Sequence, residues 1–195
     1  MPKNKVKFGL DKVCYAKATI DPETNTATYA TPVAWPGAVN LSLDPNGEVV
    51  RFRADNINYW VGESNNGYEG DYESALVPDS FKTDILNFVR DKNGVLVESS
   101  DLESQPFALI FQFKGDKHAT RHVLYNCIAT RPAVASQTTE ETTEPVTETA
   151  TITASPIYNA ALGKNIVKSS IDPDDSETVY EGWYEQVYQP VAPTP

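Results

Sequence analysis

Residues 68–77 read YEGDYESALV, and their side chains alternate between two kinds. Tyr68, Gly70, Tyr72, Ser74 and Leu76 fall on one parity, and Glu69, Asp71, Glu73, Ala75 and Val77 fall on the other. A period of two residues is typical of a β-strand whose two faces meet different surroundings. Three successive acids on one face repel one another unless that face meets water. The stretch therefore predicts a strand with one wet, acidic face.

Further strands are predicted on the C-terminal side of this stretch. They are GVLVES (94–99), FALIFQF (107–113), RHVLYNCIAT (121–130) and VTETATITA (146–154). In the second, Phe107, Leu109, Phe111 and Phe113 share one face, and in the third, Val123, Tyr125, Cys127 and Ala129 do. In the fourth stretch, one face is mostly apolar and the other consists of Thr147, Thr149, Thr151 and Thr153. Threonine suits a half-buried pleated surface, so this stretch also predicts a strand with one polar face.

Two helices are predicted. Residues 79–92 can be capped by Asp79 or Ser80 and stopped by Gly94. The apolar residues at helical spacing are Phe81, Ile85, Phe88 and Val89. Near the end of the chain, Val179, Trp183 and Val187 lie four apart and indicate a possible C-terminal helix. Gly182 and the neighbouring tyrosines leave a strand open there.

The N-terminal side predicts a strand, a hairpin and a long loop. Residues 6–20 alternate as a half-buried strand, with Lys12 breaking the apolar parity. Asp44-Pro45-Asn46-Gly47 has the residues of a tight turn and predicts a hairpin between its flanking runs. Residues 54–67 then predict an extended polar loop that carries Tyr59 and Trp60.

Together these elements predict a mainly β fold of the α+β type, in a single domain over residues 1–195. The strip QTTEETTEP (137–145) resembles a linker, but it leads directly into the alternating residues 146–154. We interpret it as an acidic Thr/Glu loop that feeds a strand of the same sheet.

The charge of the chain is −11 and unevenly spread, since residues 136–195 hold ten acids and two bases. An acidic protein is a poor nucleic-acid clamp, because phosphate binding needs clustered Lys and Arg. The N-terminus shows no secretory h-region, and no apolar run reaches the ~18 residues of a membrane span. Cys14 and Cys127 are therefore expected to be reduced thiols, although a disulfide remains possible.

Few residues suit catalysis or metal binding. The two histidines, His118 and His122, lie in a predicted turn entering a strand, which favours surface residues over a metal site. The acidic run IDPDDSE (171–177) lacks the Gly and Glu positions of an EF-hand loop. We expect no catalytic residues, no metal and no cofactor.

Several phrases of the sequence resemble one family throughout the chain. They include VKFGLDKVCYAK, PGAVNLSLDPNGE, NNGYEGDYESALVPDSFKTDIL, KHATRHVLYNCIATRPAVAS and TETATITASP, in unbroken order from about residue 5 to about residue 190. These phrases resemble the major tail protein of long-tailed bacteriophages with flexible, non-contractile tails, the type common in phages of Gram-positive hosts. No appended immunoglobulin-like module is visible.

The resemblance implies a tail tube protein with a β-sandwich or half-barrel fold and a flanking helix. Such subunits form rings, usually hexamers, that stack around a tape measure protein, between tail terminator and distal tail proteins. The expected location is the virion tail, after synthesis in the host bacterial cytoplasm. DNA is expected to pass through the lumen without specific binding, and no membrane is involved.

An acidic lumen would repel DNA and let it slide. The lumen candidates are Glu69, Asp71 and Glu73, with Thr149, Thr151 and Thr153 as a second choice; the alternative for each set is an outer solvated face. Tyr59 and Trp60 are candidates for contact with a neighbouring subunit, whereas Trp60 could instead fold into its own core. The abundant aromatics leave a carbohydrate-binding β-sandwich as the alternative function, and a metal-dependent hydrolase as a third hypothesis.

Overall fold

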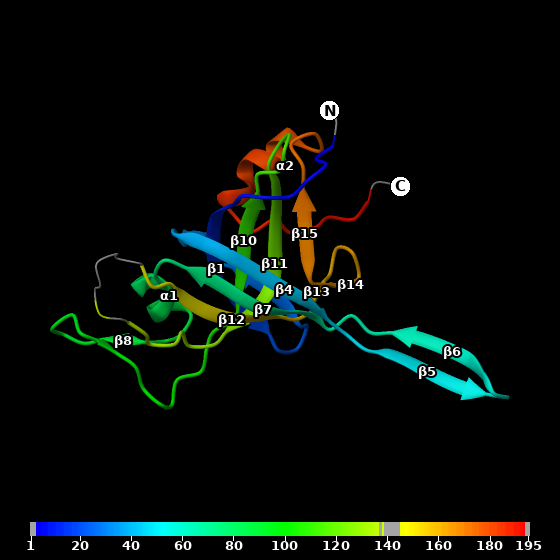
Figure 1. The fold of residues 1–195 in the computed structure, drawn as a ribbon, viewed down its shortest axis with the longest axis horizontal. Helices are drawn as coiled ribbons and strands as arrows, with labels where there is room; N and C mark the ends of the chain where they lie inside the picture. The colour runs from blue at the N-terminus through cyan, green and yellow to red at the C-terminus, as the bar shows by residue number, and fades with distance from the viewer. Residues whose placement is uncertain (1–2, 137, 139–144, 194–195) are drawn as a thin grey trace.

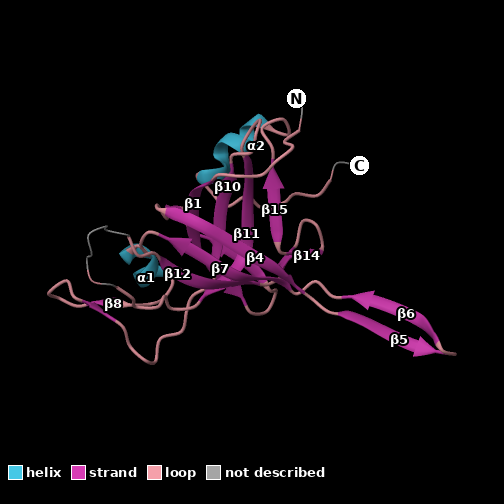
Figure 2. Ribbon diagram, in the orientation of Figure 1, coloured by secondary structure: helices cyan, strands magenta, loops and turns pink. Residues whose placement is uncertain are grey.

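Strands dominate the protein. The computed structural model describes residues 3–136, 138 and 145–193. Strands hold 47% and helices 8% of the residues, which confirms the predicted mainly β class (Figure 2). The predicted Thr/Glu loop 137–145 lies outside the described residues except for Thr138 and Pro145.

Strands of two to twelve residues and a few short helical turns follow one another along the chain. The strands are β1 (Leu10–Asp21), β2 (Thr26–Tyr29), β3 (Val33–Ala34), β4 (Ala38–Asn46), β5 (Val49–Ala54), β6 (Ile57–Glu63), β7 (Gly67–Ser74), β8 (Val89–Arg90), β9 (Leu96–Val97), β10 (Phe107–Phe113), β11 (Thr120–Ala129), β12 (Glu148–Ala154), β13 (Ile157–Asn159), β14 (Lys164–Ile166) and β15 (Lys168–Ile171). The helices are α1 (Asp79–Asp84), α2 (Glu177–Glu181) and the 3₁₀ turn η1 (Gly182–Tyr184).

The main sheet folds over at β11. Its strand order is β2-β1-β10-β11-β12-β7-β4, all antiparallel, with β15 and β3 added beside β11 and β1. The first half of β11, Arg121–Leu124, pairs with β15, and its last residues, Cys127–Ala129, pair with β12. Strands β12, β7 and β4 consequently cross in front of β1, β10 and β11, which gives a sandwich-like pair of layers (Figure 1).

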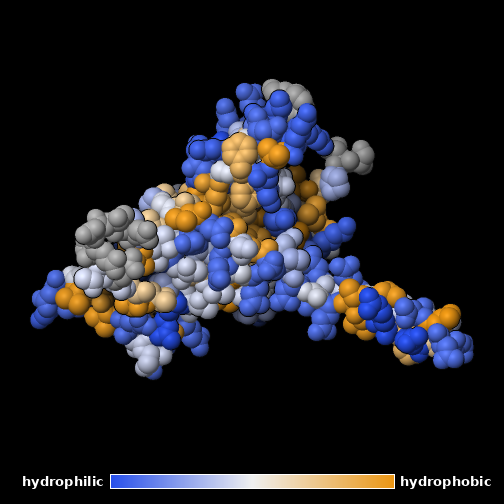
Figure 3. All heavy atoms as spheres, viewed as in Figure 1, coloured by the Kyte–Doolittle hydropathy of each residue, from blue (hydrophilic) through white to orange (hydrophobic). Residues whose placement is uncertain are grey.

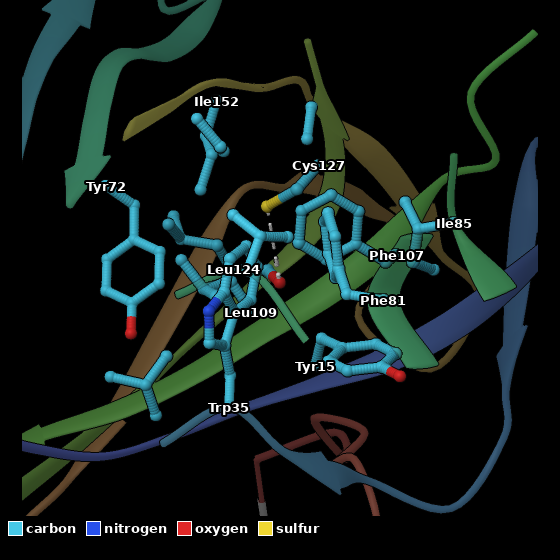
Figure 4. Packing of buried hydrophobic residues seen from close by; sticks show 14 of the residues in the cluster. Tyr15, Trp35, Tyr72, Phe81, Ile85, Phe107, Leu109, Leu124, Cys127 and Ile152 are labelled. Atoms are coloured by element: carbon cyan, nitrogen blue, oxygen red, sulfur yellow. Dashed lines mark hydrogen bonds between the residues drawn. The ribbon is translucent and has the colours of Figure 1, made fainter. Parts of the chain in front are cut away.

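One hydrophobic core fills the space between the two layers, and aromatic side chains dominate it (Figure 4). The Trp35 ring lies 4.1 Å from the Phe81 ring and 4.7 Å from the Tyr72 ring, measured between centroids. Its indole N–H donates to Ser74 Oγ at 3.1 Å, so the one polar atom of this ring is satisfied. The alternation of β10 is confirmed here, because Phe107, Leu109 and Phe111 all enter this core.

A second core covers the other face of β1, β10 and β11. Ala108, Ile110 and Val123 pack there against Trp183 and Val187 of the C-terminal segment, which confirms the possible C-terminal helix as α2 followed by η1. Both faces of β10 are therefore buried. This explains why its first five residues, 107–111, form an uninterrupted apolar run.

The hairpin predicted at Asp44–Gly47 is wrong. Strand β4 runs through Asp44 and Pro45, which pair with Glu69 and Tyr68 of β7. The chain continues into β5 and turns only at Asp55-Asn56, where both residues have positive φ (51° and 63°). Such a pair forms the tight turn that suits a twisted two-stranded ribbon. The stretch predicted as an extended loop over 54–67 is accordingly half of a hairpin, β5–β6.

The predicted helix over 79–92 is also too long. α1 ends at Asp84, and Asn87 takes a left-handed conformation with φ 58°. The amide of Leu86 donates to the carbonyl of Phe81, which closes the last turn. Ile85 and Leu86, which follow α1, are buried in the core. Val89, which was expected on the buried face of the helix, belongs instead to the exposed strand β8.

Two strand predictions missed a local irregularity. β1 begins at Leu10 rather than residue 6, and Lys12, at φ 50°, sits where the register with β10 shifts. On β11 the register shifts again between Leu124 and Cys127, so Val123 and Tyr125 face the second core while Cys127 and Ala129 face the first. One extra residue moves every following side chain to the other face.

Candidate functional surfaces

A continuous polar face covers the outer side of the β4–β7–β12 layer. It is built by residues directly opposite one another: Asn40, Glu73 and Thr149 form one row, Ser42, Asp71 and Thr151 the next, and Asp44, Glu69 and Thr153 the third. The intervening residues Leu41, Tyr72 and Ile152 point into the core on the other side. We call these nine residues the polar face.

The structure brings together the two sets of sequence-predicted lumen residues. Glu69, Asp71 and Glu73 were expected on one strand and the threonines on another, as alternatives. They are neighbours on the polar face, since β7 pairs with β12 over its whole length. Thr151 Oγ1 donates to Asp71 Oδ1 at 2.8 Å, and the Thr147 hydroxyl donates to Glu73 from just beyond the strand.

The third strand of this face was not predicted as part of it. Asn40, Ser42 and Asp44 belong to a run that was interpreted as leading into a hairpin turn. Their signal was available, because AVNLSLD alternates as regularly as the acidic strand does. The Pro-Asn-Gly that follows is typical of a turn and therefore favours a hairpin there. A proline can nevertheless occupy an edge strand.

The polar face carries negative charge only. Its four charged side chains are Asp44, Glu69, Asp71 and Glu73, and none of its nine residues is basic. Asp44, Glu69 and Asp71 are exposed to solvent. Carboxylates this close create a negative potential that repels other anions.

Strand β4 is the last strand of the sheet path on this side among the described residues. Eight of its nine residues pair with β7, and they do so along one edge only. An unpaired edge of this length presents backbone N–H and C=O groups to any strand that approaches it. The polar face can therefore be extended sideways by another chain.

The β5–β6 hairpin projects from the body as an arm (Figure 1). Tyr59 and Trp60 lie on it, with 69% and 56% of their surface exposed, so Trp60 does not fold into the core of its own chain. Phe52 is paired directly with Trp60 across the hairpin and is also exposed. The other exposed apolar residues of the arm are Val49, Val50, Ile57 and Val61.

Seven exposed apolar residues thus gather on the arm. Figure 3 shows the arm as a mixture of orange and blue, with further orange areas on the body and at the opposite end. A two-stranded hairpin is at best marginally stable by itself in water. Contiguous exposed apolar groups of this kind mark a surface that another molecule covers.

A smaller apolar patch lies at the other end of the layer. The β8–β9 hairpin exposes Val89, Val95 and Val97, and Leu76 is 67% exposed on the link between β7 and α1. Figure 1 shows β8 and the β5–β6 arm on opposite sides of the body. A molecule with apolar patches at both ends can contact two neighbours at once.

The candidate metal residues do not gather. Within residues 3–136, 138 and 145–193, no group of three or more His, Cys, Asp or Glu side chains is placed to hold a metal ion. Cys14 and Cys127 are both free thiols, and burial raises the pKa of Cys127 to about 12. In the same part of the chain, no helix is long and apolar enough to cross a membrane.

No protein-family model matches this chain, and no curated protein was found to match it.

Proposed function

We propose that this protein is a structural subunit that assembles with copies of itself into the tail tube of a long-tailed bacteriophage. The observation that carries the proposal is the polar face, a three-stranded acidic surface next to an unpaired edge strand. The sequence resemblance to major tail proteins supports the same assignment. In this role the protein is a virion component rather than an enzyme.

The polar face supplies the wall of the lumen in this proposal. Glu69, Asp71 and Glu73, with Thr149, Thr151 and Thr153, face the passing DNA. Carboxylates repel phosphates, and threonine hydroxyls keep the wall wetted without binding a specific base. The DNA therefore slides through without specific binding, after the tape measure protein has left.

The edge of β4 supplies the contact within a ring. Pairing of β4 with a strand of the next copy continues the sheet from one subunit to another. Closure of such a sheet, in a hexamer by the family pattern, removes every exposed edge. The ring then has one continuous inner surface.

The β5–β6 arm supplies contacts beyond its own subunit. Phe52, Tyr59 and Trp60 become buried when the arm lies against a neighbour in the same ring or in the next one. At the two ends of the tube, a tail terminator and a distal tail protein would meet the same surfaces.

A carbohydrate-binding module is the alternative function, and the positions of the tryptophans bear on it. Trp35 and Trp183 are 1% and 2% exposed, which leaves Trp60 as the exposed member of the three. Sugar-binding platforms need accessible aromatic faces. The arm is the remaining candidate for such a platform, and a glycan array with Trp60→Ser as control tests it.

Electron microscopy and native mass spectrometry of the purified protein test the tube proposal directly. We expect rings or stacked tubes with a central channel. A strict monomer over a range of salt, pH and protein concentration, also after addition of tail-assembly partners, would count against the proposal.

A further inference from the structure

A hollow of about 170 Å³ opens where the two layers of the fold separate. Leu41 and Leu43 of β4, Phe111 and Phe113 of β10 and Leu124 of β11 form an apolar wall. An apolar cavity of about 150 Å³ is sufficient to hold a benzene molecule. This hollow therefore has room for one ring or a short alkyl chain.

Two lysines line the hollow, Lys7 from the N-terminal segment and Lys168 from β15. Lys7 Nζ lies 4.8 Å from the centre of the Phe113 ring, and Lys168 Nζ lies 4.8 Å from the centre of the Tyr68 ring. Lys168 Nζ also donates to the Tyr68 hydroxyl at 3.3 Å. Among the described residues, neither ammonium has a carboxylate partner within 4.0 Å.

The position of Lys7 is fixed by the segment that carries it. Before Lys7, the Asn4 side chain donates to the carbonyl of His118, and the amide of Lys5 donates to Asp116. After Lys7, the carbonyl of Phe8 accepts from the amide of Gly115. The segment is thus bonded to the β10–β11 turn on both sides of Lys7, and the backbone at Lys7 is held beside the hollow.

His122 completes the rim of the hollow. Among the described residues, no Asp or Glu lines this hollow. The His122 ring stacks on Phe111 with 5.2 Å between centroids and meets Phe113 edge-on. Burial lowers the pKa of His122 to about 4, with smaller contributions from Lys168 and Lys7 in the same direction and from Asp172 in the opposite one. His122 is consequently neutral at pH 7, and the hollow presents two net positive charges.

We propose that this hollow is a binding site for a small carboxylic acid with an apolar body, either an aromatic ring or a short alkyl chain. The body fills the space between Leu41, Phe111 and Leu124. The carboxylate lies between the ammonium groups of Lys7 and Lys168, where charge-assisted hydrogen bonds hold it. Removal of the ring or chain from water adds to the binding free energy. The site is separate from the polar face and does not depend on the proposed function.

Titration with phenylacetate, followed by amide and imidazole NMR signals of the intact protein, tests the proposal. We expect saturable shifts at His122 and its neighbours, and at least tenfold weaker binding to the double variant Lys7→Gln, Lys168→Gln. Lys92→Gln with Lys164→Gln, two exposed lysines away from the hollow, is the matched control and should bind as the wild type does.

Two further measurements keep the proposal falsifiable. Bound phenylacetate should raise the pKa of His122, because its charge offsets that of the two lysines. The neutral analogue 2-phenylethanol should bind at least tenfold more weakly than phenylacetate. Equal binding of both compounds, or no saturable shift with phenylacetate, would overturn the proposal. Tighter binding of a short acidic peptide would also overturn it, in favour of a protein segment as the occupant.

Discussion

Asp44 of β4 and Glu69 of β7 are directly paired across the sheet, with both side chains on the solvent-exposed polar face. Like charges opposite one another in a sheet are destabilising. The isolated subunit therefore carries a repulsion that folding does not require. The pair does not stabilise the fold, so a function of the negative charge on this face explains it better.

Replacement of Asp44 by Asn should stabilise the isolated subunit. The substitution removes the repulsion with Glu69 and keeps a side chain of the same shape, so we expect a gain of about 0.5 kcal/mol. Urea unfolding at low ionic strength measures it. Glu63→Gln is the matched control, because Glu63 is an exposed strand carboxylate opposite Val49 and should change stability little. An equal gain in both variants would mean that net charge, rather than the pair, is responsible.

Reversal of the charge of the polar face should affect DNA passage and spare assembly. We expect the triple variant Glu69→Lys, Asp71→Lys, Glu73→Lys to form tubes of normal dimensions, because these side chains point away from the core. Phage carrying it should eject DNA poorly, since lysines bind phosphates. The triple variant with Gln, Asn and Gln at the same positions separates lost repulsion from gained attraction. Failure of the lysine variant to assemble would identify the face as an interface.

Removal of the aromatic pair on the arm should abolish assembly without unfolding the subunit. Phe52 and Trp60 face each other across the hairpin and are both more than half exposed. We expect Phe52→Ser with Trp60→Ser to leave the melting temperature nearly unchanged and to shift native mass towards the monomer. Val134→Ser removes an exposed apolar residue outside both apolar patches and is the matched control, which should assemble as the wild type does. Normal tubes from the double variant would show that the arm is not a contact.

The hydrogen bond between Trp35 and Ser74 makes a prediction about the core. Ser74→Ala leaves the buried indole N–H without its acceptor, which should cost about 1–3 kcal/mol of unfolding free energy. Trp35→Phe removes the N–H together with part of the ring. In the double variant, Ser74→Ala should therefore cost less than it does alone, and what remains is the lost hydrogen bond from Ser74 Oγ to the Leu76 carbonyl. Additive losses in this thermodynamic cycle would contradict the role of the hydrogen bond.

The sequence predicted strands well where one face is wet and the other dry. Alternation identified β7 and β12, and it separated Glu69, Asp71 and Glu73 from the core correctly. It could not show that β7 and β12 are neighbours, because pairing of strands about 80 residues apart depends on the whole sheet. The polar face was therefore predicted in two halves, and its third strand was missed.

Errors arose where local turn signals competed with long-range pairing. Asp44-Pro45-Asn46-Gly47 has better turn residues than Asp55-Asn56, yet the chain turns at the second site. Pairing of β4 with β7 through Asp44 and Pro45 outweighs the local preference. The early end of α1 has a similar cause, because Ile85 and Leu86 already fill the core and Asn87 tolerates a left-handed conformation.

His122 should make the subunit less stable as the pH falls through the mildly acidic range. Its pKa is about 4 in the folded protein, chiefly because of burial, against an ordinary value of 6.5. Between these values the unfolded chain binds a proton that the folded protein does not, so acid favours unfolding there. After allowance for partial exposure of the ring, we expect a loss of about 2 kcal/mol between pH 6.5 and pH 4, with no further loss from this group below pH 4. Urea unfolding of the wild type and of His122→Asn across this range measures it, because effects of the carboxylates cancel in the difference. The difference should shrink as the pH is lowered. A constant difference would show that His122 takes up its proton equally in both states.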